Sequence, residues 1–211
     1  MIAGCAAPAA QAHPHMWIDA RAQVAFDSQG RIAAVRQDWQ FDEMFGAYTT
    51  QGLERNPDGS LPAETLQGMA KDWMAALGEP VSHYFTRAAM GGQTLAFGPP
   101  RDAAVRWNPQ DQRLTLSFTL PLAQPVAPGA EGVQFDIYDP TYFVAYAFDA
   151  PGAVALGDAP QGCRQAYRPP RELDWKTMQQ LAAIPADPDA LPEELFAITK
   201  GLTHRIEVTC P

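Results

Sequence analysis

Strict alternation of apolar and polar residues between Trp17 and Phe26 constrains the fold of this chain more than any other feature. The apolar positions are Ile18, Ala20, Ala22, Val24 and Phe26. A period of two places neighbouring side chains on opposite faces of a β-strand, so the segment is predicted to be a strand with one buried face. A turn at residues 27–30 and a second strand ending at Phe41 complete a predicted β-hairpin.

The pattern changes at residue 42, where helical spacing begins. Asp42 is predicted to cap a short helix, because aspartate is a preferred N-cap residue. After a polar loop, Ser60 is predicted to cap a longer helix that runs from about Pro62 to Leu77. Its apolar stripe consists of Leu66, Met69, Ala70, Trp73 and Leu77. Residues 42–80 are therefore expected to form a helical insertion between strands.

Strand patterns return after residue 80 and continue to the C-terminus. Strands are expected at residues 83–90, 94–97, 104–107, 113–120, 133–138, 142–148, 153–168 and 203–209, and helices at 173–184 and 192–200. The fold class predicted is α+β: a mainly antiparallel β-sheet of about eight or more strands, with the helical insertion near residues 42–80 and short helices near the C-terminus. We expect a single domain, because 211 residues can build one well-packed core.

The charge and hydropathy of the chain exclude several classes of partner. The formal net charge is −9, which argues against binding nucleic acid or an anionic membrane surface, since both attract basic patches. No run of residues approaches the roughly 20 apolar positions that a membrane-spanning helix needs. The chain is therefore expected neither to bind nucleic acid nor to cross a membrane.

The first residues are similar to the end of an export signal. Ala10-Gln11-Ala12 matches the small-x-small pattern after which signal peptidase cuts, so residues 1–12 are predicted to be a signal-peptide remnant and residues 13–211 the mature protein. No basic region precedes the short apolar run, which indicates that the true start lies upstream. Two alternatives stay open, namely lipidation at Cys5 and an ordinary cytosolic N-terminus. In an oxidising compartment, Cys163 and Cys210 are expected to form a disulfide rather than two separate buried thiols.

Two of the four histidines, His13 and His15, lie at the proposed mature N-terminus. Residues two apart in an extended chain point to the same side, so the two imidazoles can converge on one metal ion. A chain that begins at His13 would add its α-amine as a third nitrogen ligand. Pro14 has no backbone N–H and therefore blocks the square-planar mode that uses deprotonated amides. The predicted cofactor is a divalent transition metal ion, zinc first, with nickel, cobalt or copper as alternatives.

Three carboxylates are candidates to complete the metal shell. Asp42 and Glu43 lie where a strand is expected to end and a helix to begin, and Asp139 lies in a corner between two strands. The structural alternatives are helix capping for Asp42 and an ordinary turn aspartate for Asp139. The loop from Glu54 to Thr65 is similar to a calcium loop, but threonine stands where the bidentate glutamate is needed, so we expect the loop to be empty.

Six short motifs, taken in order, connect the chain to a known family. They are HPHMWID at residues 13–19, WQFDEMF at 39–45, YFT at 84–86, FTLPL at 118–122, YDPTYF at 138–143 and GC at 162–163. The ordered set resembles the periplasmic proteins described as "ABC-type transport system, periplasmic component", a domain-of-unknown-function family. The resemblance implies export to the periplasm, a gene neighbourhood with nickel/cobalt-type permeases or zinc-responsive genes, and transition-metal handling. An inner-membrane metal permease is the protein partner that it implies.

These observations support three hypotheses about function. The first is a periplasmic transition-metal-binding protein, not an enzyme, that acts as an accessory or solute-binding component of metal transport or homeostasis. The second is a copper-dependent oxidative enzyme, which would need a further histidine at the N-terminal site, here His83 or His204. A single histidine in a strand is more often structural than a ligand. The third is a metal-free interaction module whose acidic surface docks on a membrane transporter.

Overall fold

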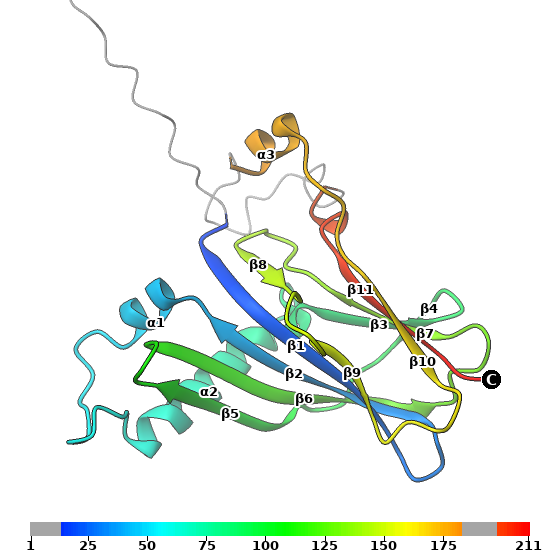
Figure 1. Cartoon of the computed structure of the whole chain (residues 1–211), viewed down its shortest axis with the longest axis horizontal. Helices are drawn as coiled ribbons and strands as arrows, with labels where there is room; N and C mark the ends of the chain where they lie inside the picture. Colours follow the sequence, from blue (N-terminus) through cyan, green and yellow to red (C-terminus); the bar gives the residue numbers. More distant parts are fainter. Residues whose placement is uncertain (1–13, 183–197) are drawn as a thin grey trace, which may run out of the picture.

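The computed structural model describes residues 14–182 and 198–211, which form two β-sheets with short helices around them (Figure 1). The six-stranded sheet has the order β5-β6-β2-β1-β8, and β9 also pairs with β1. Its strands are β1 (Met16–Phe26), β2 (Ile32–Phe41), β5 (Arg101–Asn108), β6 (Arg113–Val126), β8 (Val144–Ala147) and β9 (Val154–Gly157). The five-stranded sheet, in the order β10-β11-β7-β3-β4, consists of β3 (Thr86–Met90), β4 (Gln93–Leu95), β7 (Val133–Ile137), β10 (Arg164–Arg168) and β11 (His204–Thr209). The predicted α+β class with mainly antiparallel pairing is confirmed.

The predicted hairpin is the pair β1 and β2. Its register runs from Ile18 opposite Phe41 to the turn, and the apolar positions of β1 are buried as the alternation requires. On its other side β1 pairs in parallel, with Met16 opposite Val144 in β8 and with β9 further along. The alternation could not predict these parallel neighbours, because it reports which face is buried and not which strand lies beside it.

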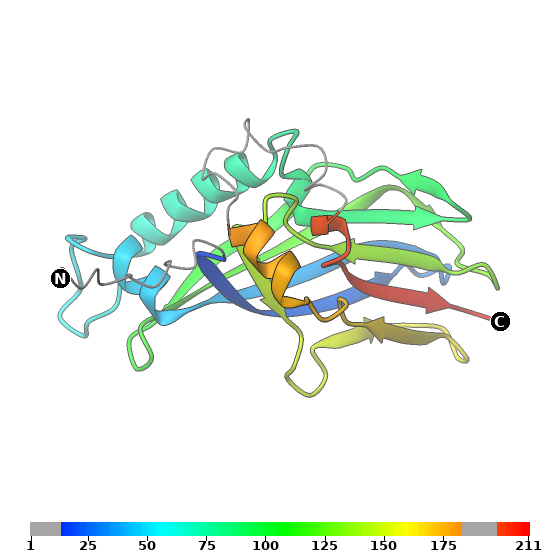
Figure 2. The same cartoon turned by 90° about the horizontal axis from the view of Figure 1, so that it is seen from above.

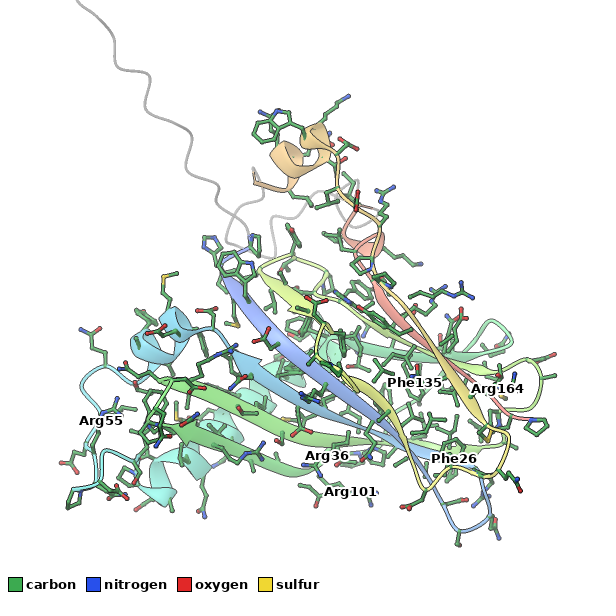
Figure 3. All side chains as sticks on the ribbon, in the orientation of Figure 1. Phe26, Arg36, Arg55, Arg101, Phe135 and Arg164 are labelled. Carbon is green, nitrogen blue, oxygen red and sulfur yellow. A yellow bond between two sulfur atoms is a disulfide. The ribbon has the colours of Figure 1, made fainter. Side chains whose placement is uncertain are left out.

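Both sheets contribute to one hydrophobic core. Trp39 of β2 lies at its centre with 1% of its surface exposed. Its indole meets the Phe118 ring edge-on at 4.9 Å between centroids and lies 5.3 Å from the Tyr146 ring. Phe135 of β7, labelled in Figure 3, fills the core from the five-stranded sheet. The position of Trp39 is therefore fixed by aromatic packing around it.

The helical insertion lies where it was predicted, but one of its caps differs. The helices are α1 (Glu43–Thr49), α2 (Ala63–Leu77) and α3 (Trp175–Ala182). Asp42 caps α1 as predicted, whereas α2 begins after Pro62 and has no side-chain cap. The prediction for Ser60 is wrong because its hydroxyl donates to the aspartate two residues before it, at 2.6 Å. Helix α2 runs along one side of the six-stranded sheet, against β5 (Figure 2).

A strained turn, η1 (His83–Phe85), connects α2 to β3. Its three residues have φ values of +46°, +55° and +46°, in the left-handed region that non-glycine residues avoid. The strand predicted from His83 therefore begins only at Thr86. The turn packs closely on the end of α2, where a Cβ on Gly78 would lie 2.9 Å from the Tyr84 hydroxyl oxygen.

The C-terminal part of the chain is held by the predicted disulfide between Cys163 and Cys210. This bond joins the start of β10 to the end of β11, two strands that also pair along their length. Of the predicted helix at 192–200, residues 198–200 are helical and the rest lies outside the described residues, as does the proposed cleavage site. None of the described helices is both long enough and apolar enough to cross a membrane.

Candidate functional site

The proposed metal-binding end of the chain leads into β1. His13 lies outside the described residues, whereas His15 stands directly before β1 with an exposed side chain. The His15 backbone N–H donates to the Phe143 carbonyl at 2.9 Å, and the two rings lie 4.9 Å apart between centroids. His15 is therefore anchored to the segment before β8. As predicted, His15 and Trp17 share the outward side of the chain, opposite the buried Ile18.

Asp42 closes the β1–β2 pair at the same end. Its Oδ1 accepts from the Phe45 backbone N–H at 2.8 Å, and its Oδ2 accepts from the Trp17 backbone N–H at 2.9 Å. The Asp42 backbone N–H in turn donates to the Trp17 carbonyl at 2.9 Å. The side chain thus caps α1 and extends the strand pairing by one residue. Glu43 follows in the first turn of α1 and is exposed.

Asp139 has a different environment from Asp42. It is 4% exposed, and its carboxylate organises the corner between β7 and β8. Oδ1 accepts from the backbone N–H and the hydroxyl of Thr141, both at 2.8 Å, and Oδ2 accepts from the Val144 backbone N–H at 2.9 Å. Burial raises the pKa of Asp139, and these hydrogen bonds lower it in part. The turn-aspartate alternative describes this arrangement well.

The structure brings the predicted ligands together only in part. His15, Asp42 and Glu43 lie at one end of the β1–β2 pair, and Asp139 is buried in the corner between β7 and β8. Among residues 14–182 and 198–211, no three His, Cys, Asp or Glu side chains are grouped closely enough to hold a metal ion. A metal site here would therefore need a ligand from outside this part of the chain, and His13 is the predicted one.

The remaining histidines are not grouped with His15. His204 is buried in β11, and its Nδ1 lies 2.7 Å from the Tyr167 hydroxyl. Burial lowers the pKa of His204 to about 4, although the Asp149 carboxylate and a hydrogen bond to the Tyr146 backbone oppose this shift. His204 is therefore a neutral, hydrogen-bonded residue of the core. His83 lies in the strained turn, where partial burial and the nearby Arg87 lower its pKa.

The loop resembling a calcium site is stabilised by its own side chains. The Asp58 carboxylate accepts from both the backbone N–H and the hydroxyl of Ser60, and the Asn56 amide donates to the same hydroxyl at 2.9 Å. These hydrogen bonds lower the pKa of Asp58. The Arg55 guanidinium donates to the Gly59 carbonyl and lies over the Trp107 ring, 4.9 Å from its centroid. The loop geometry is thus that of a self-bonded turn.

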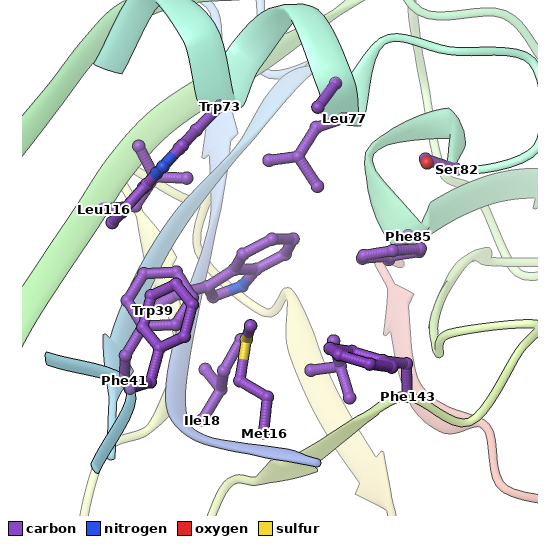
Figure 4. A pocket seen from close by; sticks show the side chains of 13 residues that line it. Met16, Ile18, Trp39, Phe41, Trp73, Leu77, Ser82, Phe85, Leu116 and Phe143 are labelled. Atoms are coloured by element: carbon purple, nitrogen blue, oxygen red, sulfur yellow. The ribbon is translucent and has the colours of Figure 1, made fainter. Parts of the chain in front are cut away.

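An apolar pocket of about 250 Å³ lies next to this end of β1 (Figure 4). The pocket is lined by Met16, Ile18, Trp39, Phe41, Phe45, Trp73, Ala76, Leu77, Ser82, Phe85, Leu116, Phe143 and Val144. These residues come from the sheet, from α1 and α2, from the turn η1 and from the start of β8. Phe143 both lines the pocket and contacts the His15 ring, so the pocket and the proposed metal end share one side chain.

One polar group in the pocket wall has no partner within the described part of the chain. The indole Nε1 of Trp39 is buried and makes no hydrogen bond there. In Figure 4 this nitrogen lies on the side of the indole that faces Met16. A buried N–H without an acceptor is costly, because it has lost its hydrogen bond to water. Such a group in a pocket wall is a place where a ligand can bind.

Comparison with known sequences identifies the family. A family model described as "Protein of unknown function (DUF1007)" matches residues 1–210. The chain belongs to the DUF1007 family. It is also similar to an "Uncharacterized protein" of Haemophilus influenzae (strain ATCC 51907 / DSM 11121 / KW20 / Rd), with 25% identity over 154 residues. That alignment covers 72% of this chain and 71% of the relative. The predicted membership of a domain-of-unknown-function family is confirmed.

The pocket of this DUF1007 protein was not predicted from the sequence. Ile18, Trp73 and Leu77 lie on predicted apolar faces, but apolar spacing indicates burial and not whether the space between two buried faces is filled. The signal available was the density of aromatic residues in WQFDEMF at 39–45, together with Trp73 on the facing helix stripe. The rings on the sheet and on the helix leave space between them here, and the sequence pattern alone does not show it.

Proposed function

We propose that this DUF1007 protein is an exported transition-metal-binding protein, with zinc as the first candidate and nickel, cobalt or copper as alternatives. The observation that carries the proposal is the placement of His15. It is exposed and anchored directly before β1, at the end of the β1–β2 pair where Asp42 and Glu43 also lie. Since His15 is followed by an ordered strand, a metal bound there would be held against the fold.

The proposed ligands differ in availability. His13 and His15 supply imidazoles, and a mature chain beginning at His13 supplies its α-amine as well. Both oxygens of Asp42 already accept backbone N–H groups, but a carboxylate has about four acceptor sites and can still meet a cation. Glu43 is exposed and makes the simplest additional ligand. Asp139 is the least accessible of the three, since its oxygens hold a buried corner.

The proposed setting is the periplasm, with an inner-membrane metal permease as partner. An intramolecular disulfide is consistent with an oxidising compartment. The formal net charge of −9 suits a protein that concentrates cations near its surface. In this role the protein would deliver or buffer the metal as an accessory or solute-binding component of transport or homeostasis. Determining the mature N-terminus by mass spectrometry of the exported protein tests the export step directly.

The binding proposal is tested by calorimetric titration of the chain beginning at His13 with Zn²⁺, Ni²⁺, Co²⁺ and Cu²⁺. At least one metal is expected to bind with a dissociation constant of about 1 μM or tighter. The double variant His13→Ala, His15→Ala should lose this binding, and His15→Ala alone should weaken it at least about tenfold, because one ligand is removed. Absence of measurable binding by the chain beginning at His13 contradicts the proposal.

The matched control is His83→Asn, which removes an imidazole that is not one of the proposed ligands and lies in the strained turn η1. Asparagine tolerates the left-handed backbone that residue 83 adopts, so the variant should fold normally. Its metal affinity is expected to equal that of the parent chain. Equal losses in His83→Asn and His15→Ala would instead point to non-specific binding by surface histidines.

A further inference from the structure

We propose that the apolar pocket beside β1 binds a small neutral molecule that is mainly apolar and carries one hydrogen-bond acceptor. The pocket has a volume of about 250 Å³ and lies between the six-stranded sheet and helix α2. This inference goes beyond the metal proposal and does not depend on it. The two also involve opposite ligand chemistries, a cation at the exposed strand end and an uncharged molecule in the pocket.

The walls exclude a charged ligand. Six aromatic rings line the pocket, and none of the described residues that line it has an ionisable side chain. The Phe41 ring lies 4.7 Å from the Phe45 ring and 5.0 Å from the Trp73 ring, centroid to centroid. An ion entering this space would lose its hydration and gain no opposite charge, so a neutral molecule is strongly preferred. Aromatic walls favour flat or ring-shaped ligands, since rings stack on one another.

The acceptor is inferred from Trp39. Its Nε1 is buried in the pocket wall without a hydrogen-bond partner among the described residues, and the side chain is 1% exposed. The Phe118 and Tyr146 rings hold the indole in place, so rotation of the side chain cannot bring the N–H to water. A carbonyl or ether oxygen of a ligand would accept from this N–H. Ser82 is the other polar side chain of the lining and adds a hydroxyl.

The size of the pocket limits the ligand to a small one. Apolar cavities of about 150 Å³ hold benzene, and pockets for drug-sized molecules measure about 300–1,000 Å³. A pocket of about 250 Å³ therefore accommodates on the order of ten non-hydrogen atoms. A long acyl chain or a peptide segment would not fit within it. The ligand class is a small aromatic or cyclic ketone, ester or ether.

One wall of the pocket is built from strained backbone. Phe85 lines the pocket from the turn η1, in which three successive non-glycine residues have positive φ. Such strain persists only where packing holds it, and it is typical of ligand sites. The close approach of the Tyr84 hydroxyl to Gly78 fixes this turn against the end of α2. The wall is thus preformed, which lowers the entropic cost of binding.

The test uses the full chain, labelled with ¹⁵N and kept in EDTA so that bound metal cannot contribute. Three probes are titrated: acetophenone, which is neutral and has an acceptor; ethylbenzene, which lacks one; and benzoate, which is charged. We expect acetophenone to bind with a dissociation constant of about 0.1–1 mM and to move the Trp39 indole N–H proton downfield. Ethylbenzene should bind without that downfield shift, and benzoate should not bind. Trp39→Phe identifies the resonance among the five tryptophans.

The decisive variant is Ala76→Phe. Ala76 is exposed on α2 and lines the pocket, so phenylalanine there should fill the pocket without disturbing the core. It should weaken acetophenone binding at least about tenfold. Ala75→Phe is the matched control, since Ala75 is the preceding exposed residue of the same helix and does not line the pocket. Failure of acetophenone to bind, binding that survives Ala76→Phe, or equal binding of benzoate would each overturn the proposal.

Discussion

Two groups of polar side chains near the start of β1 differ in how far they are exposed to water. At the β1 corner, formed by His15, Asp42 and Glu43, every side chain is at least partly exposed. In the buried polar cluster, formed by Asp139 and His204 next to β8, Asp139 is 4% and His204 7% exposed. Asp42 and Asp139 have the same structural role in the two groups, because each carboxylate accepts hydrogen bonds from two backbone N–H groups at a chain corner.

This difference in exposure shows which polar groups are available to a ligand and which serve only the structure. An exposed polar group keeps its hydration, so a ligand can replace water there at little cost. A buried one must be satisfied by the protein, and any group left over is destabilising. The Tyr146 hydroxyl is such a group, since it is buried without a partner among the described residues. Burial, together with the nearby Asp139, raises the pKa of Tyr146 well above its ordinary value.

The largest expected effect is that of Asp139→Ala. It removes the acceptor for the Thr141 and Val144 backbone N–H groups, and the latter is buried. A buried donor without an acceptor costs about 1–3 kcal/mol, and the part-buried Thr141 donor costs less, so we expect the free energy of unfolding to fall by up to about 4 kcal/mol. Urea unfolding followed by tryptophan fluorescence measures this loss.

Asp139→Asn is the matched variant at this corner. Its amide oxygen can still accept from Thr141, but its NH₂ group would face the Val144 N–H, so about half of the loss should remain. The metal affinity of the chain beginning at His13 should be unchanged in this variant if the corner has only a structural role. A loss of affinity would instead place Asp139 among the metal ligands.

The second effect is the dependence of stability on pH that His204 confers. The pKa of His204 falls from its ordinary value of 6.5 to about 4 in the folded protein, because burial disfavours the charged imidazole. The unfolded state therefore binds more protons between these two values, and the stability present above pH 6.5 is lost as the pH falls towards 4. The loss amounts to about 3 kcal/mol.

The measurement compares urea unfolding of the parent chain and of His204→Asn at several pH values between 4 and 6.5. Asparagine cannot take up the proton, so the variant should lack this part of the acid destabilisation. The raised pKa of Asp139 acts in the opposite direction, because its folded state takes up a proton more readily as the pH falls. This contribution is common to both proteins and cancels in the difference. Identical pH profiles would mean that His204 is not held neutral by burial.

The sequence predicted most of the fold and only the polar part of the site. Alternation located β1 and β2 because one face of each is buried, and the helix spacing located α2 for the same reason. The strain at residues 83–85 escaped prediction, since no glycine or asparagine marks the left-handed turn. Asp42 and Asp139 were recognised as corner residues, but their difference in burial arises from packing between distant strands.

The apolar pocket beside β1 also depends on packing that the sequence pattern does not report. Most residues that line it have a spacing consistent with a filled core, and the pocket exists because rings from the sheet, α1 and α2 leave space between them. His15 was predictable as exposed, because it lies on the polar side of the alternation that continues into β1. Its contact with Phe143 was not, since it depends on the parallel pairing of β1 with β8.

The smallest expected effect is that of Asp42→Ala. Its loss of stability is to be compared with that of Asp139→Ala. The substitution removes the acceptor for the Phe45 and Trp17 backbone N–H groups, but water can reach this half-exposed corner and replace it. Loss of a helix cap costs about 1 kcal/mol, with an upper value of about 2 kcal/mol. We therefore expect urea unfolding to give a loss well below that of Asp139→Ala.

Glu43→Ala is the control for Asp42→Ala, because residue 43 is the adjacent exposed carboxylate and caps nothing. It should change the free energy of unfolding by no more than about 0.5 kcal/mol, through loss of its favourable interaction with the N-terminus of α1. If Asp42→Ala proves as costly as Asp139→Ala, water does not replace the lost acceptors at the β1 corner. The corner would then be as closed as the buried cluster, and a metal ion could reach it only by displacing the Asp42 hydrogen bonds.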